Sequence, residues 1–187
     1  MVSFEEIQTA YYMVAATGVL IAAVFYILNL RISQRNQKET LQTRQAQLLF
    51  SLQKDMTDYQ GWLRYRELMY MKWDSYEDFE NKYGSNNNPT SYAMRLAYWV
   101  WCNNLGMLLK RKLIDEDDTY DSFGSGFIMQ WIEWEPIIKE QRRRYMGSNW
   151  MENWEYAADR MRAVQKRRGI SWEPPETSIR YVPDATQ

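Results

Sequence analysis

The 187-residue sequence contains no histidine and a single cysteine, Cys102. Without histidine the chain can form no Ser-His-Asp triad, no imidazole metal site and no Glu-x-x-His di-iron site. One cysteine excludes a disulfide within the chain and a zinc or iron–sulfur cluster held by several thiolates of one chain, and it agrees with a reducing compartment. The missing residue types therefore exclude many metalloenzymes and nucleophilic hydrolases.

Motifs that bind calcium or phosphate are also missing. A calcium loop that starts at Asp115 would need glycine at its sixth position and glutamate at its twelfth, where the chain has Tyr120 and Gly126. The acidic run 115–118 instead suits the first turn of a helix, where negative charge complements the helix dipole. Gly124-Ser125-Gly126 is not followed by the Gly-Lys-Ser/Thr of a phosphate-binding loop, so we expect a plain loop there.

Carboxylate pairs are the remaining candidates for catalysis. Glu133 with Glu140, and Glu152 with Glu155 or Asp159, stand at helical spacing, which is typical of solvated faces that pair with lysine or arginine. We therefore predict no catalytic, cofactor-binding or metal-binding residues, no cofactor, and a protein that is not an enzyme.

The chain does contain one long stretch without charge, the 24 residues from Ile7 to Leu30. As a helix this stretch would reach roughly 36 Å, enough to cross a hydrocarbon core of about 30 Å. A cleaved signal peptide would have a basic start and a shorter apolar core, whereas Glu5-Glu6 precede this one. The sequence therefore predicts an uncleaved transmembrane helix over 7–30.

Positive charge follows this segment and does not precede it. Arg31, Arg35, Lys38 and Arg44 come directly after it. Because basic residues stay on the cytoplasmic side, we expect residues 1–6 to lie outside and the rest to lie in the cytoplasm, beneath the cell's inner membrane. This makes the chain a single-pass protein of that membrane.

Small residues share one face of the expected membrane helix. Ala15, Gly18 and Ala22 are three and four positions apart, a spacing that permits close contact with another helix. The bilayer and other membrane protein subunits are thus the expected partners. A parallel homodimer is an alternative, since apolar residues recur at positions 48, 52, 56, 59 and 63, but a lasting heptad repeat is missing.

The fold class predicted for the whole chain is all-α, with the membrane helix continuing into a cytoplasmic multi-helix bundle. We divide the chain into a helical extension at 31–57, a helical domain at 58–168 and an extended proline-containing tail at 169–187. Nine tryptophans, fourteen tyrosines and eleven methionines argue against disorder and favour a partner surface. Leu96 to Leu109 carries no charge, but it is too short for a second span, so a buried central helix is expected.

Local signals predict where helices begin and break. We expect helices to be capped by Asp74, by Thr90 or Ser91, and by a capping box over Asn149–Glu152. Pro136 predicts a break and Gly169 an end. Gly106, within the central helix, indicates close packing against a neighbour.

Basic residues gather near the C-terminus, with nine Lys or Arg against four Asp or Glu between Lys139 and Arg168. The candidate contact residues are Lys139, Arg142, Arg143, Arg144, Lys166, Arg167 and Arg168. Solvated helix ends are the first interpretation, contact with anionic lipid the second, and nucleic acid the least favoured.

Three segments carry a family resemblance. They are 104–115 (NLGMLLKRKLID), 131–138 (WIEWEPII) and 150–156 (WMENWEY). In spacing and residue type they resemble an uncharacterised bacterial and archaeal family of small helical domains, over roughly 45–161. The resemblance implies an all-helical cytoplasmic domain on a single membrane anchor, and no activity.

The expected function follows from the anchor and the missing chemistry. We expect a membrane-anchored helical interaction protein, an accessory or scaffolding subunit of a membrane protein assembly. The alternative is a membrane-tethered sensor or effector, for example in cellular defence, that binds nucleic acid or nucleotide through the basic C-terminal helices.

Overall fold

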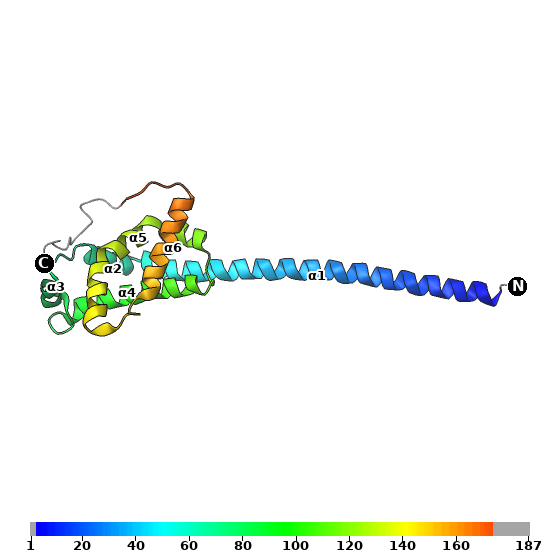
Figure 1. The fold of residues 1–187 in the computed structure, drawn as a ribbon, viewed down its shortest axis with the longest axis horizontal. Coiled ribbons are helices and arrows are strands. Elements are labelled where there is room, and N and C mark those ends of the chain that lie inside the picture. Colours follow the sequence, from blue (N-terminus) through cyan, green and yellow to red (C-terminus); the bar gives the residue numbers. More distant parts are fainter. Residues whose placement is uncertain (1–2, 174–187) are drawn as a thin grey trace. The chain divides into compact units, whose positions relative to one another are not determined.

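A computed structural model describes residues 3–173 of the chain. These residues form six α-helices and one π-helix, and they contain no strand, which confirms the all-α class (Figure 1). By internal packing the chain divides into two units, Met1–Arg44 and Gln45–Gln187. The boundary between the two units falls inside the first helix.

Helix α1 (Phe4–Thr57) contains the whole of the apolar stretch in the first unit. A capping box opens it, because Glu6 N donates to Ser3 Oγ over 3.3 Å and Ser3 N donates to Glu6 Oε2 over 2.8 Å. None of the side chains in its most apolar part is buried. By length and composition this helix is able to cross a membrane.

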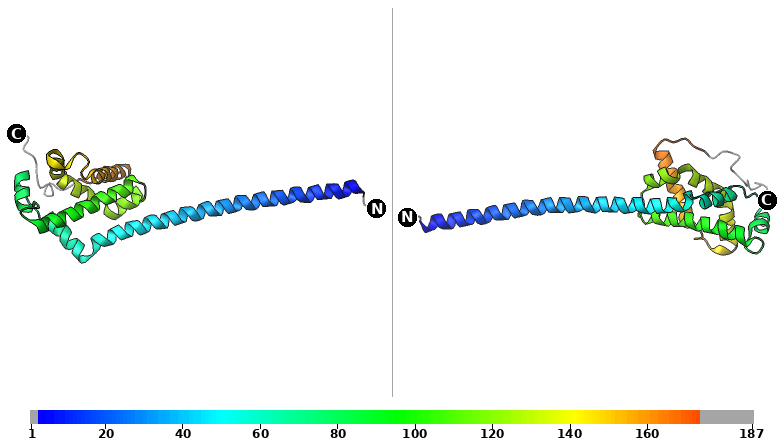
Figure 2. Two further views of the ribbon diagram at one scale, coloured as in Figure 1. Left: turned by 90° about the horizontal axis from the view of Figure 1, so that it is seen from below. Right: turned by 180° about the vertical axis from the view of Figure 1, so that it is seen from behind.

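The second unit is a helical bundle (Figure 2). Its further elements are α2 (Tyr59–Met69), α3 (Tyr76–Tyr83), α4 (Pro89–Lys110), α5 (Glu116–Gln141), the π-helix η1 (Arg142–Met146) and α6 (Glu152–Arg167). Helix α4 is the predicted central helix, since α6, α2 and α3 all pack against it, and α6 also packs on α5. Leu49, Leu52 and Met56 of α1 lie against the same core.

Tryptophan side chains from three helices fill the middle of this bundle. Trp99 of α4, Trp131 and Trp134 of α5 and Trp154 of α6 are each at most 1% exposed. The ring of Trp154 lies 5.4 Å from that of Trp131, and the ring of Trp99 lies 5.3 Å from that of Trp134. These four tryptophans therefore serve the core of the bundle.

Two predicted helix caps were wrong by one to three residues. Ser75, not Asp74, caps α3, and its hydroxyl accepts from Asp78 N. Asn88, not Thr90 or Ser91, caps α4, with Pro89 in the first turn. Ser75, one residue after Asp74, has the extended backbone of a cap. Asn88 lies before Thr90 and Ser91, and the proline that follows it suits the first helical position.

The structure also differs from the breaks predicted within α5. The backbone departs from helical geometry at Gly124 alone, with φ of 42°, so the expected loop at 124–126 is a kink within one element. Pro136 does not break the helix, although its ring removes a donor. Trp134, Ile137 and Ile138 around it are buried, and their packing holds the helix together.

The start of α6 is capped by another helix. No side chain of its own segment caps it; Met151 occupies the cap position with φ of 55°, so the expected capping box at Asn149 was wrong. The Oδ1 atom of Asn103 on α4 instead accepts from Asn153 N at 3.1 Å and Trp154 N at 3.3 Å. This contact needs the close approach that Gly106 allows: a Cβ there would lie 1.8 Å from the Asn153 carbonyl oxygen.

The end of α6 follows the prediction. Gly169 has φ of 66°, and Ile170 N donates to the Gln165 carbonyl, which closes the helix with a glycine cap. The expectation of a proline-containing tail rests on Pro174, Pro175 and Pro183, which lie outside the described residues.

Candidate functional site

The basic residues proposed as contact sites lie at the end of α5, in η1 and at the end of α6. Six of the seven form ion pairs with carboxylates of the same domain. The pairs are Lys139 with Glu135, Arg142 with Glu155, Arg143 with Glu140, Arg144 with Glu140 and Glu77, Arg167 with Asp117, and Arg168 with Asp117 and Asp121. Lys166 is exposed and has no ion pair within 3–173.

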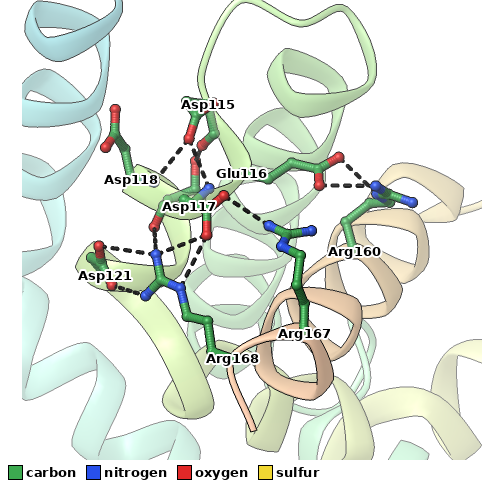
Figure 3. A network of polar contacts seen from close by, with 9 residues as sticks. Asp115, Glu116, Asp117, Asp118, Asp121, Arg160, Arg167 and Arg168 are labelled. Atoms are coloured by element: carbon green, nitrogen blue, oxygen red, sulfur yellow. Dashed lines mark hydrogen bonds and ion pairs between the residues drawn. The ribbon is translucent and has the colours of Figure 1, made fainter. Parts of the chain in front are cut away.

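The C-terminal end of α6 faces the acidic start of α5 (Figure 3). Asp115 caps α5 by accepting from the backbone N–H groups of residues 117 and 118. Its neighbour Asp117 accepts from Arg167 at 2.7 Å and from Arg168 at 3.0 Å. Arg168 also binds Asp121, and this hydrogen bond lowers the pKa of the Asp121 carboxyl. The acidic run therefore joins two helices.

The arginines of η1 are held in the same way. Arg143 and Arg144 both donate to Glu140, and these hydrogen bonds lower the pKa of that carboxyl to about 2. Arg142 donates to the Trp150 carbonyl oxygen at 2.6 Å and to Glu155 at 2.7 Å. Much of the positive charge at this end of the domain is thus balanced internally, which leaves less of it for phosphate groups.

The small residues proposed as a helix-packing face are exposed. Ala15, Gly18 and Ala22 lie exposed along α1, and a Cβ at Gly18 would meet nothing within 4 Å. The carboxylates considered for catalysis lie elsewhere: Glu133 is buried and accepts from Gln130 Nε2, while Glu152, Glu155 and Asp159 each pair with a basic residue. Within the described part of the chain, no three His, Cys, Asp or Glu residues group as metal ligands.

A cavity of about 450 Å³ opens between α3, α4 and η1. It is lined by Tyr76, Glu80, Ser85, Asn86, Tyr92, Arg95, Leu96, Trp99, Gln141, Arg144, Tyr145, Met146 and Trp150. Its volume falls in the range of about 300–1,000 Å³ that small-molecule sites have. Aromatic rings, one buried arginine and a group of tyrosine and glutamate oxygens meet in it.

Arg95 is the unusual member of this set, because its side chain is only 1% exposed. Its guanidinium carbon lies 4.3 Å from the ring centre of Phe79 and 4.7 Å from that of Trp99. One nitrogen, Nη2, donates to the Tyr83 carbonyl oxygen at 3.3 Å. Burial lowers the pKa of Arg95 to about 10, so the side chain stays cationic at neutral pH.

Three side-chain oxygens of residues that line the cavity form a hydrogen-bonded group. The Tyr76 hydroxyl donates to Glu80 Oε1 over 2.9 Å and lies 2.5 Å from the Tyr145 hydroxyl. The Tyr145 hydroxyl in turn lies 3.3 Å from Glu80 Oε1. Burial, followed by these hydrogen bonds, raises the pKa of Tyr76, so its hydroxyl keeps its proton. Arg144 stacks over the Tyr76 ring at 4.2 Å.

A second, smaller hollow is apolar, and we call it the aromatic groove. It has a volume of about 190 Å³ and is lined by Gln53, Met56, Thr57, Trp62, Tyr65, Tyr98, Trp101, Ser122, Phe123, Gly126 and Phe127. Its rings follow one another at 5.4 to 6.2 Å, from Trp62 through Tyr65, Tyr98 and Trp101 to Phe123. Trp62, at one end, is 57% exposed.

The model of one protein family, a domain of unknown function named DUF4760, matches residues 13–161. The chain belongs to the DUF4760 family. No curated protein and no solved structure matches the chain. The resemblance to an uncharacterised family is thereby confirmed, and the match begins inside the apolar stretch of α1 rather than at Gln45.

Sequence reasoning missed the cavity of this DUF4760 domain, although one signal for it was present. Arg95, Trp99, Cys102, Gly106 and Leu109 recur at intervals of three and four, and all five are buried. A charged residue therefore stands on the apolar face of α4, where it must lose its hydration. The partners on α3 and η1 could not be found this way, because only the fold brings them to α4.

Proposed function

We propose that this DUF4760 protein is a single-pass, membrane-anchored interaction protein that serves as an accessory or scaffolding subunit of a membrane assembly. The observation that carries the proposal is the apolar half of α1, whose side chains are all exposed. Exposed apolar surface of this length is costly in water and stable in a bilayer. The protein then displays its helical bundle at the membrane surface.

The direction of insertion is part of the proposal. Arg31, Arg35 and Lys38 follow the apolar stretch in α1, while Glu5 and Glu6 occupy its first turn. By the positive-inside rule, this arrangement supports an N-terminus outside and a bundle in the cytoplasm beneath the inner membrane.

The aromatic groove supports contact with a protein partner. Trp, Tyr and Met are enriched in the centres of protein interfaces, and the groove is built mainly from these residues and phenylalanine. The exposed ring of Trp62 is the side chain there with most surface left to bury. We therefore assign the groove to an apolar segment of another subunit.

Purification of the full chain in a mild uncharged detergent, followed by mass spectrometry, tests this proposal. We expect a membrane protein to come along in a fixed ratio and to be lost from Trp62→Ala. Tyr70→Ala is the matched control, because Tyr70 is 69% exposed and lies outside the groove. A clean monomer, or a partner held equally by both variants, would contradict the proposed role of the groove.

The alternative, a tethered sensor or effector that binds nucleic acid or nucleotide through the basic C-terminal helices, has less support. Its residues Arg142, Arg143 and Arg144 are paired with carboxylates. Salt-dependent retention of RNA or DNA, lost when these three are changed to glutamine, would favour this function over the first.

A further inference from the structure

The Arg95 cavity contains polar hydrogens for which the described residues provide no acceptor. Among residues 3–173, Arg95 Nε and Nη1 are buried and have no hydrogen-bond partner. The same holds in that range for Trp99 Nε1, the indole nitrogen of a second residue that lines the cavity. Other buried atoms of the bundle, such as Trp154 Nε1 and Arg142 Nη2, also have no partner in that range, but here three such donors belong to two residues that line one hollow.

Because Arg95 is charged, the lack of an acceptor for its Nε and Nη1 atoms is more significant. Within the described part of the chain Arg95 forms no ion pair, and Nη2 has only a backbone carbonyl oxygen. Burial of a cation without an anion costs several kcal/mol in proteins. The nearby Glu80 carboxylate favours the charged form, but its Oε1 atom already accepts from Tyr76. A negatively charged group rich in acceptors therefore complements the cavity.

The other walls limit what else such a ligand contains. Tyr76, Tyr92, Trp99 and Trp150 present aromatic rings to the hollow, and aromatic walls favour a planar ring. Glu80, with the Tyr76 and Tyr145 hydroxyls, forms a polar wall that accepts hydrogen bonds from hydroxyl or amino groups. A volume of about 450 Å³ admits a small molecule and excludes a folded partner.

We propose that this cavity is a binding site for a small organic oxyanion, a phosphate or carboxylate attached to a planar ring. The oxyanion pairs with the charge of Arg95. Because Arg95 Nε and Nη1 and Trp99 Nε1 are buried in this structure, the two side chains adjust on binding so that these atoms donate to it, and the ring stacks on the aromatic walls. Hydroxyl or amino groups of the ligand donate to Glu80. The domain is then a ligand-binding module, independently of whether the aromatic groove binds a partner.

The test uses the full chain in an uncharged detergent and follows tryptophan fluorescence and the thermal unfolding midpoint. The probes are adenosine monophosphate and 4-hydroxybenzoate, with adenosine and 4-hydroxybenzamide as their uncharged counterparts. We expect saturable binding of at least one charged probe and a raised midpoint, with affinity at least about tenfold above that of its neutral counterpart. Binding of the phosphate probe alone or the carboxylate probe alone identifies which oxyanion the site takes.

Substitutions then locate the binding. Arg95→Met keeps an unbranched apolar stem and removes the charged guanidinium, so we expect at least about a tenfold loss of affinity. Arg162→Met is the control, since Arg162 pairs with Asp159 on the surface of α6 and does not line the cavity. If Arg95→Met fails to fold, Trp99→Phe keeps an aromatic ring, removes one donor and should weaken binding several-fold.

Three results would overturn the proposal. They are no binding of either charged probe, equal binding of charged and neutral probes, and undiminished binding by a folded Arg95→Met or, failing that, Trp99→Phe variant. None of these results bears on the copurification experiment, which depends on Trp62 in the aromatic groove.

Discussion

The two ends of α6 are held by different kinds of contact. At its start, Gly106 lets α4 approach so closely that Asn103 caps α6 through two backbone N–H groups. At its end, Arg167 and Arg168 pair with Asp117 and Asp121 at the protein surface. The start of α6 is close-packed and partly buried, whereas its end is exposed to water.

The difference indicates where the stability of the bundle lies. Close-packed contacts tolerate no added atom, because neither backbone is able to move away without losing buried surface. Exposed ion pairs gain little, since water and salt screen them. We expect the start of α6 to determine the stability of the domain, and its end to determine how that stability varies with salt and pH.

The largest effect is expected at Gly106. A valine there would place Cβ 1.8 Å from the Asn153 carbonyl oxygen, which forces α4 and α6 apart. We expect Gly106→Val to cost at least about 3 kcal/mol of unfolding free energy, measured by urea titration of tryptophan fluorescence. Gly126→Ala is the control, because a Cβ at Gly126 meets nothing within 4 Å. Equal stability of the two variants would contradict the close approach.

The cap from Asn103 comes next. Asn103→Ala leaves Asn153 N and Trp154 N without their acceptor, and loss of such a cap costs about 1 kcal/mol. Asn104→Ala changes the exposed neighbour on the same helix and should leave the urea midpoint in place. If both changes had the same small effect, α6 would not depend on α4 for its cap.

Acid should weaken the surface pairs before it affects the packed end. Bonds from Arg143 and then Arg144 lower the pKa of Glu140 from 4.5 to about 2, and Arg168 lowers that of Asp121. A lowered folded-state pKa contributes stability above the unfolded pKa, and this contribution disappears as pH falls toward the folded pKa. We expect the thermal midpoint to fall between pH 4.5 and about 2. Glu140→Gln should flatten that part of the profile, and an unchanged profile would argue against the pairs.

The smallest effect is expected at Arg168 itself. Arg168→Gln removes the bonds to Asp117 and Asp121, and we expect a drop in thermal midpoint smaller than that of Asn103→Ala. The drop should disappear in about 1 M salt, where the Debye length is about 3 Å. Lys166→Gln serves as control, since Lys166 forms no ion pair within 3–173. A salt-independent loss would mean that Arg168 acts through packing, for example over the Tyr120 ring.

Local patterns predicted some helix ends correctly and missed others. The Gly169 cap was predictable, because glycine alone adopts the required φ cheaply. The start of α6 was not, because its cap is Asn103, 50 residues away in sequence. The break predicted at Pro136 was wrong for a related reason. The free-energy cost of a proline inside the helix is offset by the packing of Ile137 and Ile138.

The candidate sites show the same limit. The sequence showed that Arg144, Arg167 and Arg168 carry charge, but it did not show which carboxylates they pair with. These partners come from other helices. Arg95 stood at a core position of α4, and its spacing with Trp99 was visible. Its place beside Glu80 and Tyr145 follows from the packing of α3 and η1 around α4.

The sequence by itself determined the all-helical class, the apolar stretch able to cross a membrane, and the closeness implied by Gly106, because each depends on composition or on one residue's sterics. The tertiary structure alone decided which charges are paired on the surface and that Arg95 lies buried in a cavity. Pairing and desolvation depend on groups distant in sequence, and only packed helices bring such groups within a few ångströms.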